Sequence, residues 1–156
     1  MNAPTAETAP TGFVGLYRSI WKGLERVPIA LPVVVMRAGV ALVFWRSGQS
    51  KLPLGNESTI GLFRDIYQVP LLPPTLAAYL ATMVEIACPV LLLLGVLTRP
   101  AAAILLAQTI VIQLFVFPEN YPDHLLWAGP LLYLFLRGPG KWSFDALIRD
   151  RIGGGR

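Results

Sequence analysis

Charged side chains are scarce in this sequence. Only 14% of its 156 residues are Asp, Glu, Lys or Arg, whereas 54% are hydrophobic. Soluble domains carry about 25% charged residues. So few charges cannot cover the surface of a compact soluble globule, but they can cover the two polar caps of a body whose sides face lipid. The composition therefore excludes an ordinary soluble domain and predicts an integral membrane protein.

Side chains for redox and metal chemistry are also few, with one cysteine, Cys88, and one histidine, His124. A lone cysteine excludes an intramolecular disulfide and a C-x-x-C pair, so the chain cannot carry out dithiol–disulfide chemistry by itself. The sequence contains no Gly-rich phosphate loop, catalytic triad or haem motif. We therefore expect no covalent cofactor, and an enzyme acting alone is the less favoured interpretation.

The sequence does contain long apolar runs, which lie within residues 29–137 and are separated by loop-like stretches. A helix needs about 20 residues to cross the hydrocarbon core of a bilayer. The runs predict four transmembrane helices, the fourth of them short, at approximately 31–50, 75–97, 100–117 and 124–137. The predicted fold is an all-α, integral membrane four-helix bundle.

The segments before and after the bundle have different compositions. Residues 1–11 are small and polar, and we predict that they are disordered. In residues 12–28, apolar side chains from Phe13 to Leu24 recur at helical spacing, with basic residues on the opposite face. This pattern predicts an amphipathic helix that lies in the lipid headgroup layer; the alternative is a helix that packs on a soluble core. Residues 138–156 form a basic tail.

The distribution of basic residues predicts the orientation, because cytoplasmic loops carry an excess of Lys and Arg. With Arg37 set aside, nine basic residues share the side of both termini and three lie on the other side. The first group is Arg18, Lys22, Arg26, Arg99, Arg137, Lys141, Arg149, Arg151 and Arg156, and the second is Arg46, Lys51 and Arg64. Both termini are therefore predicted to be cytoplasmic. Because these residues flank apolar runs and form no continuous patch, we expect no nucleic-acid partner.

Glu85 interrupts the second apolar run near its middle. A carboxylate at this depth usually faces the bundle interior and has a partner. Pro89 has no backbone N–H to donate to the carbonyl of Glu85. The carboxyl group and the free backbone carbonyl of Glu85 therefore lie at the same depth in the membrane. Together they could bind a cation, a water or a ligand donor. We predict that Arg37 is the partner, with Arg46 as a second candidate; the alternative is that an Arg37–Glu85 pair only fixes helix packing.

Other polar residues give weaker signals. Gln108 and Gln113 lie on the third run, where Gln side chains commonly bridge helices; ligand binding is the alternative. His124 follows Glu119 and Asp123, but the spacing is not a known metal-ligand signature. We favour a loop histidine that caps the fourth helix over a metal ligand.

Four stretches of the chain carry a resemblance to a known family. They are Met36–Gly39, the G-Q-S-K-L stretch Gly48–Leu52, the Leu-rich run from Glu85 to Arg99, and the tail stretch Arg137–Asp145. Their order resembles the DoxX (DoxD-like) family of four-helix membrane proteins over roughly residues 30–148. The family positions carried over to this sequence are Arg37, Gly48, Lys51, Glu85 and Arg99.

The resemblance implies a bacterial inner-membrane protein linked to a redox system, because the family's namesake is a subunit of a thiosulfate:quinone oxidoreductase. The first hypothesis is a membrane subunit or scaffold that binds quinone or lipid and docks a soluble redox partner on one face. The alternatives are a small transporter or proton- or solute-binding protein acting alone, for which a homo-oligomer would supply the path, and a structural assembly factor. The candidate polar site comprises Glu85, Arg37, Arg46, Lys51, Gln108 and Gln113.

Overall fold

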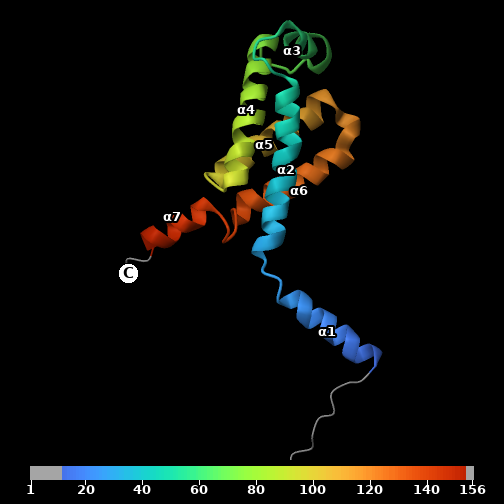
Figure 1. The fold of residues 1–156 in the computed structure, drawn as a ribbon. Helices are drawn as coiled ribbons and strands as arrows, with labels where there is room; N and C mark the ends of the chain where they lie inside the picture. Colours follow the sequence, from blue (N-terminus) through green and yellow to red (C-terminus); the bar gives the residue numbers. More distant parts are fainter. Residues whose placement is uncertain (1–11, 154–156) are drawn as a thin grey trace, which may run out of the picture.

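The computed structural model describes residues 12–153, which are built from helices and contain no strand (Figure 1). This confirms the prediction of an all-α protein. The predicted disordered segment 1–11 and residues 154–156 lie outside the described range. The elements are α1 (Phe13–Glu25), α2 (Ala30–Ser50), α3 (Glu57–Leu62), the π-helix η1 (Phe63–Tyr67), α4 (Pro74–Leu94), α5 (Thr98–Val111), the π-helix η2 (Ile112–Val116), the 3-10 helix η3 (Pro118–Asn120), α6 (Tyr121–Arg137) and α7 (Phe144–Gly153).

Within residues 12–153, three helical segments are long and apolar enough to cross a membrane: α2, α4, and α5 with its continuation η2. The fourth helix, α6, has 17 residues and is about 25 Å long. It runs antiparallel to α5, because His124 near its start contacts Gln113 of η2, and Leu136 near its end contacts Arg99 at the start of α5. The helix α6 therefore runs along α5, and it also packs on α2.

The bundle core is apolar and contains several small side chains. The helix α2 packs along α4, and α5 packs along both α4 and α6. Small residues let helix backbones approach closely in membranes. The buried core residues are Val33, Val40, Ala41, Phe44, Cys88, Leu92, Ala101, Ala102, Leu105, Leu131 and Leu134. Large apolar side chains such as Leu42, Leu94 and Ile110 are exposed on the outside, where a membrane protein meets lipid.

The helices α2 and α4 are staggered along their axes. A Cβ atom added at Gly48, close to the end of α2, would lie 2.9 Å from the backbone of Glu85, which is in the middle of α4. The first half of α4 therefore extends past the end of α2. There it packs on α3 and η1, through a second cluster of Phe63, Ala77 and Ala78. Glu85 consequently lies beside the end of α2 and not beside its middle.

The tail is bonded to the turn between α4 and α5. The Asp145 carboxylate accepts hydrogen bonds from Leu97 N at 2.9 Å and Thr98 N at 3.0 Å. In return, Asp145 N donates to Gly95 O at 2.9 Å. Ser143 Oγ accepts from Ala146 N at 3.2 Å at the start of α7, as an N-cap residue does. The start of α7 is therefore fixed against the end of the bundle.

The helix α1 stands away from the bundle (Figure 1). None of its residues is buried, and the side chains of Phe13, Leu16 and Leu24 are 82%, 61% and 55% exposed. Tyr17 and Trp21 pack edge to face, with their ring centroids 5.8 Å apart. The apolar face of α1 is thus open, and its position in the headgroup layer stays a prediction.

Candidate functional site

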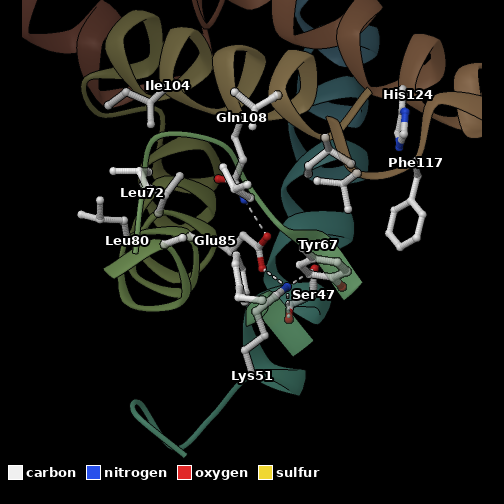
Figure 2. Close-up of a pocket in the computed structure, with 18 of the residues that line it drawn as sticks. Ser47, Lys51, Tyr67, Leu72, Leu80, Glu85, Ile104, Gln108, Phe117 and His124 are labelled. Atoms are coloured by element: carbon white, nitrogen blue, oxygen red, sulfur yellow. Dashed lines mark hydrogen bonds and ion pairs between the residues drawn. The ribbon is translucent and has the colours of Figure 1, made fainter. Parts of the chain in front are cut away.

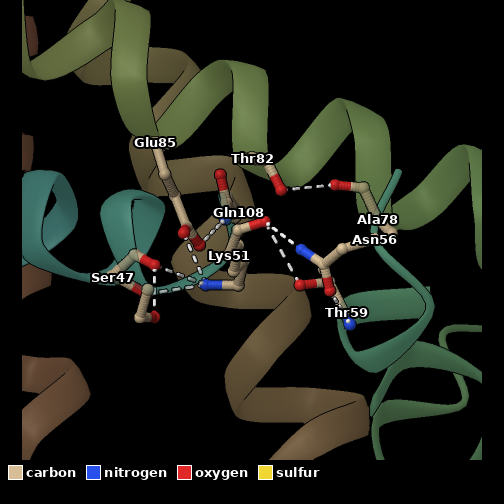
Figure 3. A network of polar contacts seen from close by, with 9 residues as sticks. Ser47, Lys51, Asn56, Thr59, Ala78, Thr82, Glu85 and Gln108 are labelled. Atoms are coloured by element: carbon tan, nitrogen blue, oxygen red, sulfur yellow. Dashed lines mark hydrogen bonds and ion pairs between the residues drawn. The ribbon is translucent and has the colours of Figure 1, made fainter. Parts of the chain in front are cut away.

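A buried ion pair lies between the end of α2 and the middle of α4. Lys51 Nζ is 2.6 Å from Glu85 Oε2, and the two side chains are only 7% and 3% exposed. Lys51 Nζ also donates to Ser47 Oγ at 2.8 Å and to Ser47 O at 3.2 Å (Figure 3). An ammonium group has three N–H donors, so these three acceptors use all of them.

Gln108 extends the ion pair to a third helix. Its Nε2 donates to Glu85 Oε1 at 2.6 Å, so Gln108 bridges α5 and α4, as the sequence predicted for a Gln in this run. Gln108 Oε1 is buried and has no hydrogen-bond partner among the described residues. The polar site therefore holds a carboxylate with both oxygens engaged and an amide oxygen that still requires a donor.

The loop after α2 holds Lys51 in place. Lys51 O accepts from Asn56 Nδ2 at 3.0 Å and from Thr59 Oγ1 at 3.2 Å. Asn56 Oδ1 in turn accepts from Thr59 N at 2.7 Å, so Asn56 is the N-cap of α3. These bonds turn the chain back at the end of α2, and the Lys51 side chain can therefore reach Glu85 inside the bundle.

The predicted pairing of Arg37 with Glu85 is wrong. Arg37 Nη1 donates to Pro139 O and Trp142 O, both at 3.0 Å, and Nη2 donates to Leu93 O at 3.3 Å. The stagger explains the error. Gly48 lies opposite Glu85, and Arg37, eleven residues earlier in α2, is about 16 Å away along the helix axis. Arg37 therefore binds the tail and is not part of the polar site.

We expect Arg37→Met to loosen the tail and to leave the Lys51–Glu85 pair intact. The substitution removes the donor from three carbonyls, and each buried polar group left without a partner costs about 1–3 kcal/mol. Amide hydrogen exchange at Asp145 and in the rest of α7 should become at least tenfold faster, with no change around Glu85. Arg46→Met, at an exposed position of the same helix, is the control. Unchanged exchange in α7, or the same increase in both variants, would contradict this role of Arg37.

Two further candidates lie outside the ion-pair network. Arg46 is exposed on the outer face of α2, so it does not approach Glu85. Gln113 is near the other end of the cavity described below, where its Nε2 donates to Pro118 O at 2.7 Å and its Oε1 is 2.6 Å from His124 Nδ1. Of the six candidate residues, the structure brings together Glu85, Lys51 and Gln108.

His124 is not the predicted loop histidine at a helix cap. It lies within α6 and is 4% exposed. Asp123 and Glu119 are exposed, and the described residues contain no group of three or more His, Cys, Asp or Glu placed to hold a metal ion. The sequence predicted α6 to begin at 124, whereas it begins at Tyr121, with Pro122 in its first turn. The earlier start places His124 inside the helix.

The hydrogen bonds of Gln113 indicate which ring nitrogen of His124 acts as the donor. Gln113 Nε2 donates to a backbone carbonyl, so its Oε1 is the atom that faces His124. An amide oxygen only accepts hydrogen bonds. His124 Nδ1 therefore carries a proton, and in the neutral imidazole Nε2 is the acceptor. Nothing in the sequence around His124 indicated this contact, because it depends on the packing of α6 on η2.

A cavity of about 370 Å³ lies beside the ion pair (Figure 2). Its lining is mostly apolar and comes from the end of α2 and from η1, α4, α5, η2, η3 and α6. Polar side chains in the lining are Ser47, Lys51, Tyr67, Glu85, Gln108, Asn120 and His124. Leu80 and Ile104 also line the cavity, and they are 46% and 47% exposed on the outer apolar surface. The cavity is therefore adjacent to the lipid-facing side of the bundle.

Tyr67 is a hydrogen-bond donor on the cavity wall, and it was not among the candidate residues predicted from the sequence. It belongs to η1, and its ring packs edge to face on Phe63 and Phe117 with centroid distances of 4.9 and 5.5 Å. Burial raises the pKa of the Tyr67 phenol, and the nearby Glu85 carboxylate raises it further. Tyr67 thus keeps its proton at neutral pH and remains a hydrogen-bond donor.

Comparison with known proteins places the sequence in a family. The sequence model of DoxX matches residues 33–118. The chain belongs to the DoxX family. It is also 33% identical to an uncharacterized membrane protein of Mycobacterium tuberculosis, in an alignment that covers 76% of this chain and 82% of that protein. No solved structure matches.

The DoxX match covers the residues of the ion-pair network. Ser47, Lys51, Glu85 and Gln108 all lie within residues 33–118. The helices α6 and α7 follow the matched segment, so His124 and the bonded tail lie beyond it. The polar site is therefore built mostly from the DoxX segment, and α6 adds one wall of the cavity.

Proposed function

We propose that this DoxX-family membrane protein binds a hydrophobic ligand with a hydroxyl-bearing head, of the quinol class, and serves as the membrane subunit of a redox system. The observation that carries the proposal is the apolar cavity of about 370 Å³ that has the Lys51–Glu85–Gln108 network in its wall. Ligand pockets have volumes of about 300–1,000 Å³ and combine apolar walls with a few placed polar groups. The size and lining of this cavity suit one small ring with polar substituents.

The hydrogen-bond inventory favours a head that donates. Lys51 uses its three N–H groups within the protein, so it has none left for a ligand carbonyl. Glu85 accepts one bond at each oxygen, whereas a carboxylate offers about four acceptor positions. Gln108 Oε1 has no partner in the described chain. A quinol hydroxyl can donate to these oxygens, but a quinone carbonyl would be repelled by them.

The position of Arg37 also favours the reduced form. An arginine beside Glu85 could donate to a quinone carbonyl, but Arg37 is bonded to the tail and to Leu93 O. His124 lines the same cavity, and its Nε2 is an acceptor in the neutral form. Glu85 and His124 would thus accept from a ligand that has two hydroxyl groups, as a quinol does.

Access from the bilayer supports a lipid-soluble ligand. Leu80 and Ile104 belong both to the cavity wall and to the outer surface, so only side chains separate the cavity from lipid. A transporter for water-soluble solutes would need a polar path between the two membrane faces. The apolar lining of this cavity does not supply such a path, and it fits a ligand that diffuses within the membrane.

The proposal places the protein in a bacterial inner membrane, with α6 as the fourth crossing and both termini in the cytoplasm. The excess of Lys and Arg in and directly after α1, at the α4–α5 turn and in the tail supports this orientation. The open apolar face of α1 would lie in the cytoplasmic headgroup layer. A soluble redox partner would dock on the same basic face.

Binding of a benzoquinol with a short alkyl tail, and of its oxidised quinone, tests the proposal. Trp127 lines the cavity, so quenching of its fluorescence should report occupancy in protein held in lipid nanodiscs. We expect the quinol to bind at least tenfold more tightly than the quinone, because hydrogen bonds to charged groups contribute about 1.5–3 kcal/mol. Gln108→Leu should weaken quinol binding about tenfold.

Gln49→Leu is the matched control, because Gln49 is exposed on α2 and does not line the cavity. It should leave quinol binding unchanged. Equal affinities for quinol and quinone, or unchanged quinol binding in Gln108→Leu, would argue against the proposed function. Glu85 itself is left intact in this experiment, because its replacement would also disturb the fold.

A further inference from the structure

We infer that a basic cleft at the tail end of the bundle binds the phosphate group of an anionic phospholipid. The cleft has a volume of about 540 Å³ and lies between the start of α5, the end of α6 and the tail. Its charged lining residues are four cations and one carboxylate: Arg99, Arg137, Lys141, Arg149 and Asp145. This site is separate from the cavity beside the Lys51–Glu85 pair, and the inference does not rest on the proposed function.

The carboxylate in the cleft is already engaged. Both Asp145 oxygens accept bonds from the first amides of α5, Leu97 N and Thr98 N. Asp145 thus occupies the helix N-terminus, where an anion is stabilised by the helix dipole. An incoming phosphate would therefore bind among the basic side chains, and its negative charge would be compensated by them.

The cations of the cleft are available for a ligand. Among residues 12–153, Arg137 and Lys141 have no ion-pair partner. Arg99 makes a long bond of 3.4 Å to Leu136 O, and the contact of Arg149 with Asp150, at 3.9 Å, lies between side chains that are 74% and 77% exposed. Arginine and lysine bind phosphate oxygens through charge-assisted hydrogen bonds. These side chains can therefore turn to a phosphate without breaking a buried interaction.

A second observation in the cleft is Thr98, which is 0% exposed. Thr98 lines the cleft. Its side-chain oxygen, Oγ1, is buried and has no hydrogen-bond partner among the described residues. A buried hydroxyl without a hydrogen-bond partner is unfavourable. A phosphate oxygen at this wall would accept from Thr98 Oγ1.

The backbone around the cleft is held in one arrangement. Gly138 follows α6 with φ +83°, and Arg99 Nε lies 3.5 Å from the position of a Cβ at Gly138. The Arg99 side chain therefore packs over the turn. From the bundle side, Arg37 donates to Pro139 O and Trp142 O. The turn that carries Lys141 is thus bonded on both flanks, and the cleft exists before a ligand arrives.

The depth of the cleft favours a lipid as the source of the phosphate. It adjoins the turn between α4 and α5, two helices long enough to cross the membrane, so it lies at headgroup level. Trp142 and Phe144, beside the cleft, are 54% and 52% exposed, and tryptophan is enriched at membrane interfaces. Figure 1 shows α7 extending outward from this end of the bundle. Basic residues at this level attract anionic lipids.

Native mass spectrometry of the full chain, released from nanodiscs of phosphatidylglycerol and phosphatidylcholine, tests the inference. We expect retained phosphatidylglycerol on the wild type. Arg137→Gln with Lys141→Gln should reduce that retention by about fivefold for each charge removed. The matched control is Arg18→Gln with Lys22→Gln, which removes two basic residues from α1, away from the cleft. The control should retain at least half of the bound lipid.

The outcomes separate the sources of the phosphate. Equal loss of phosphatidylglycerol in both double variants would overturn the site, because it would show general attraction to basic residues. Retention of phosphatidylcholine at the same level as phosphatidylglycerol would also overturn it.

Inorganic phosphate is then added in detergent, without lipid. If it raises the melting temperature of wild type and control but not of the cleft variant, while no lipid is retained, the site binds free phosphate and the lipid assignment is wrong.

Discussion

Lys51→Met should destabilise the protein far more than the combination of Lys51→Met with Glu85→Gln. The single substitution leaves a buried carboxylate without its cation, and breaking a buried ion pair in this way costs about 3–5 kcal/mol. The double variant removes both charges, and a Gln at position 85 can still accept from Gln108. We expect the double variant to recover all but about 1–2 kcal/mol of the loss. Reversible unfolding in mixed micelles measures these differences.

The identity of the partner is tested in the same measurement. Arg37→Met combined with Glu85→Gln should show additive losses, because the two side chains share no partner and lie far apart. Arg46→Met, at an exposed position, should change the unfolding free energy by less than about 0.5 kcal/mol. Equal stabilities for Lys51→Met and the Lys51–Glu85 double variant would show that the pair is not energetically coupled.

Gly48→Ala should destabilise the bundle by about 1–3 kcal/mol, as overpacking of a tight core does. A Cβ at Gly48 would lie 2.9 Å from the Glu85 carbonyl oxygen, carbonyl carbon and Cβ. The Glu85 carbonyl lacks its helical donor because residue 89 is a proline, and the hydrogen atoms on Gly48 Cα let α2 approach it closely. Displacement of α2 would also lengthen the Lys51–Glu85 contact. We therefore expect Gly48→Ala to lower the affinity for quinol as well as the stability.

Gly39→Ala is the matched control for Gly48→Ala. Gly39 lies in the same helix and is exposed, and no heavy atom lies within 4 Å of the position that its added Cβ would take. Since alanine favours a helix over glycine by about 1 kcal/mol, Gly39→Ala should leave stability unchanged or raise it. If Gly48→Ala is tolerated equally well in the unfolding assay, the close approach of α2 to α4 does not limit stability.

The helices and the central carboxylate could be read from the sequence, because both are local signals. Apolar runs of membrane length predict helices wherever they pack, and a Glu inside such a run is expensive unless it has a partner. The bridging role of Gln108 followed from the same rule. Glu85 and Gln108 could therefore be predicted as site residues without knowing how the helices are arranged.

The partner of Glu85 could not be read in this way. Its identity depends on the axial offset between α2 and α4, which is set by the packing of α3 and η1 on the start of α4. Arg37 and Glu85 would lie at the same depth only if α2 and α4 had no axial offset, and the sequence does not reveal this offset. Lys51 entered the candidate site only through the family resemblance, because it follows the apolar run and looks like a solvated loop residue.

His124 was missed for a related reason. Its burial comes from the contact of α6 with η2, and its hydrogen-bond partner Gln113 is eleven residues earlier. A histidine next to Asp and Pro residues has the local composition of a loop. Only the three-dimensional packing distinguishes it from an exposed residue.

The bonds of Arg37 also constrain the order in which the molecule can be completed during synthesis. Arg37 belongs to α2, but two of its three carbonyl partners, Pro139 O and Trp142 O, are 102 and 105 residues later in the chain. Until those residues emerge, a guanidinium group in an apolar helix has to remain near water or lipid headgroups. The helix α2 can therefore reach its final depth only after Trp142 has been made, so a segment translated about a hundred residues later completes its insertion.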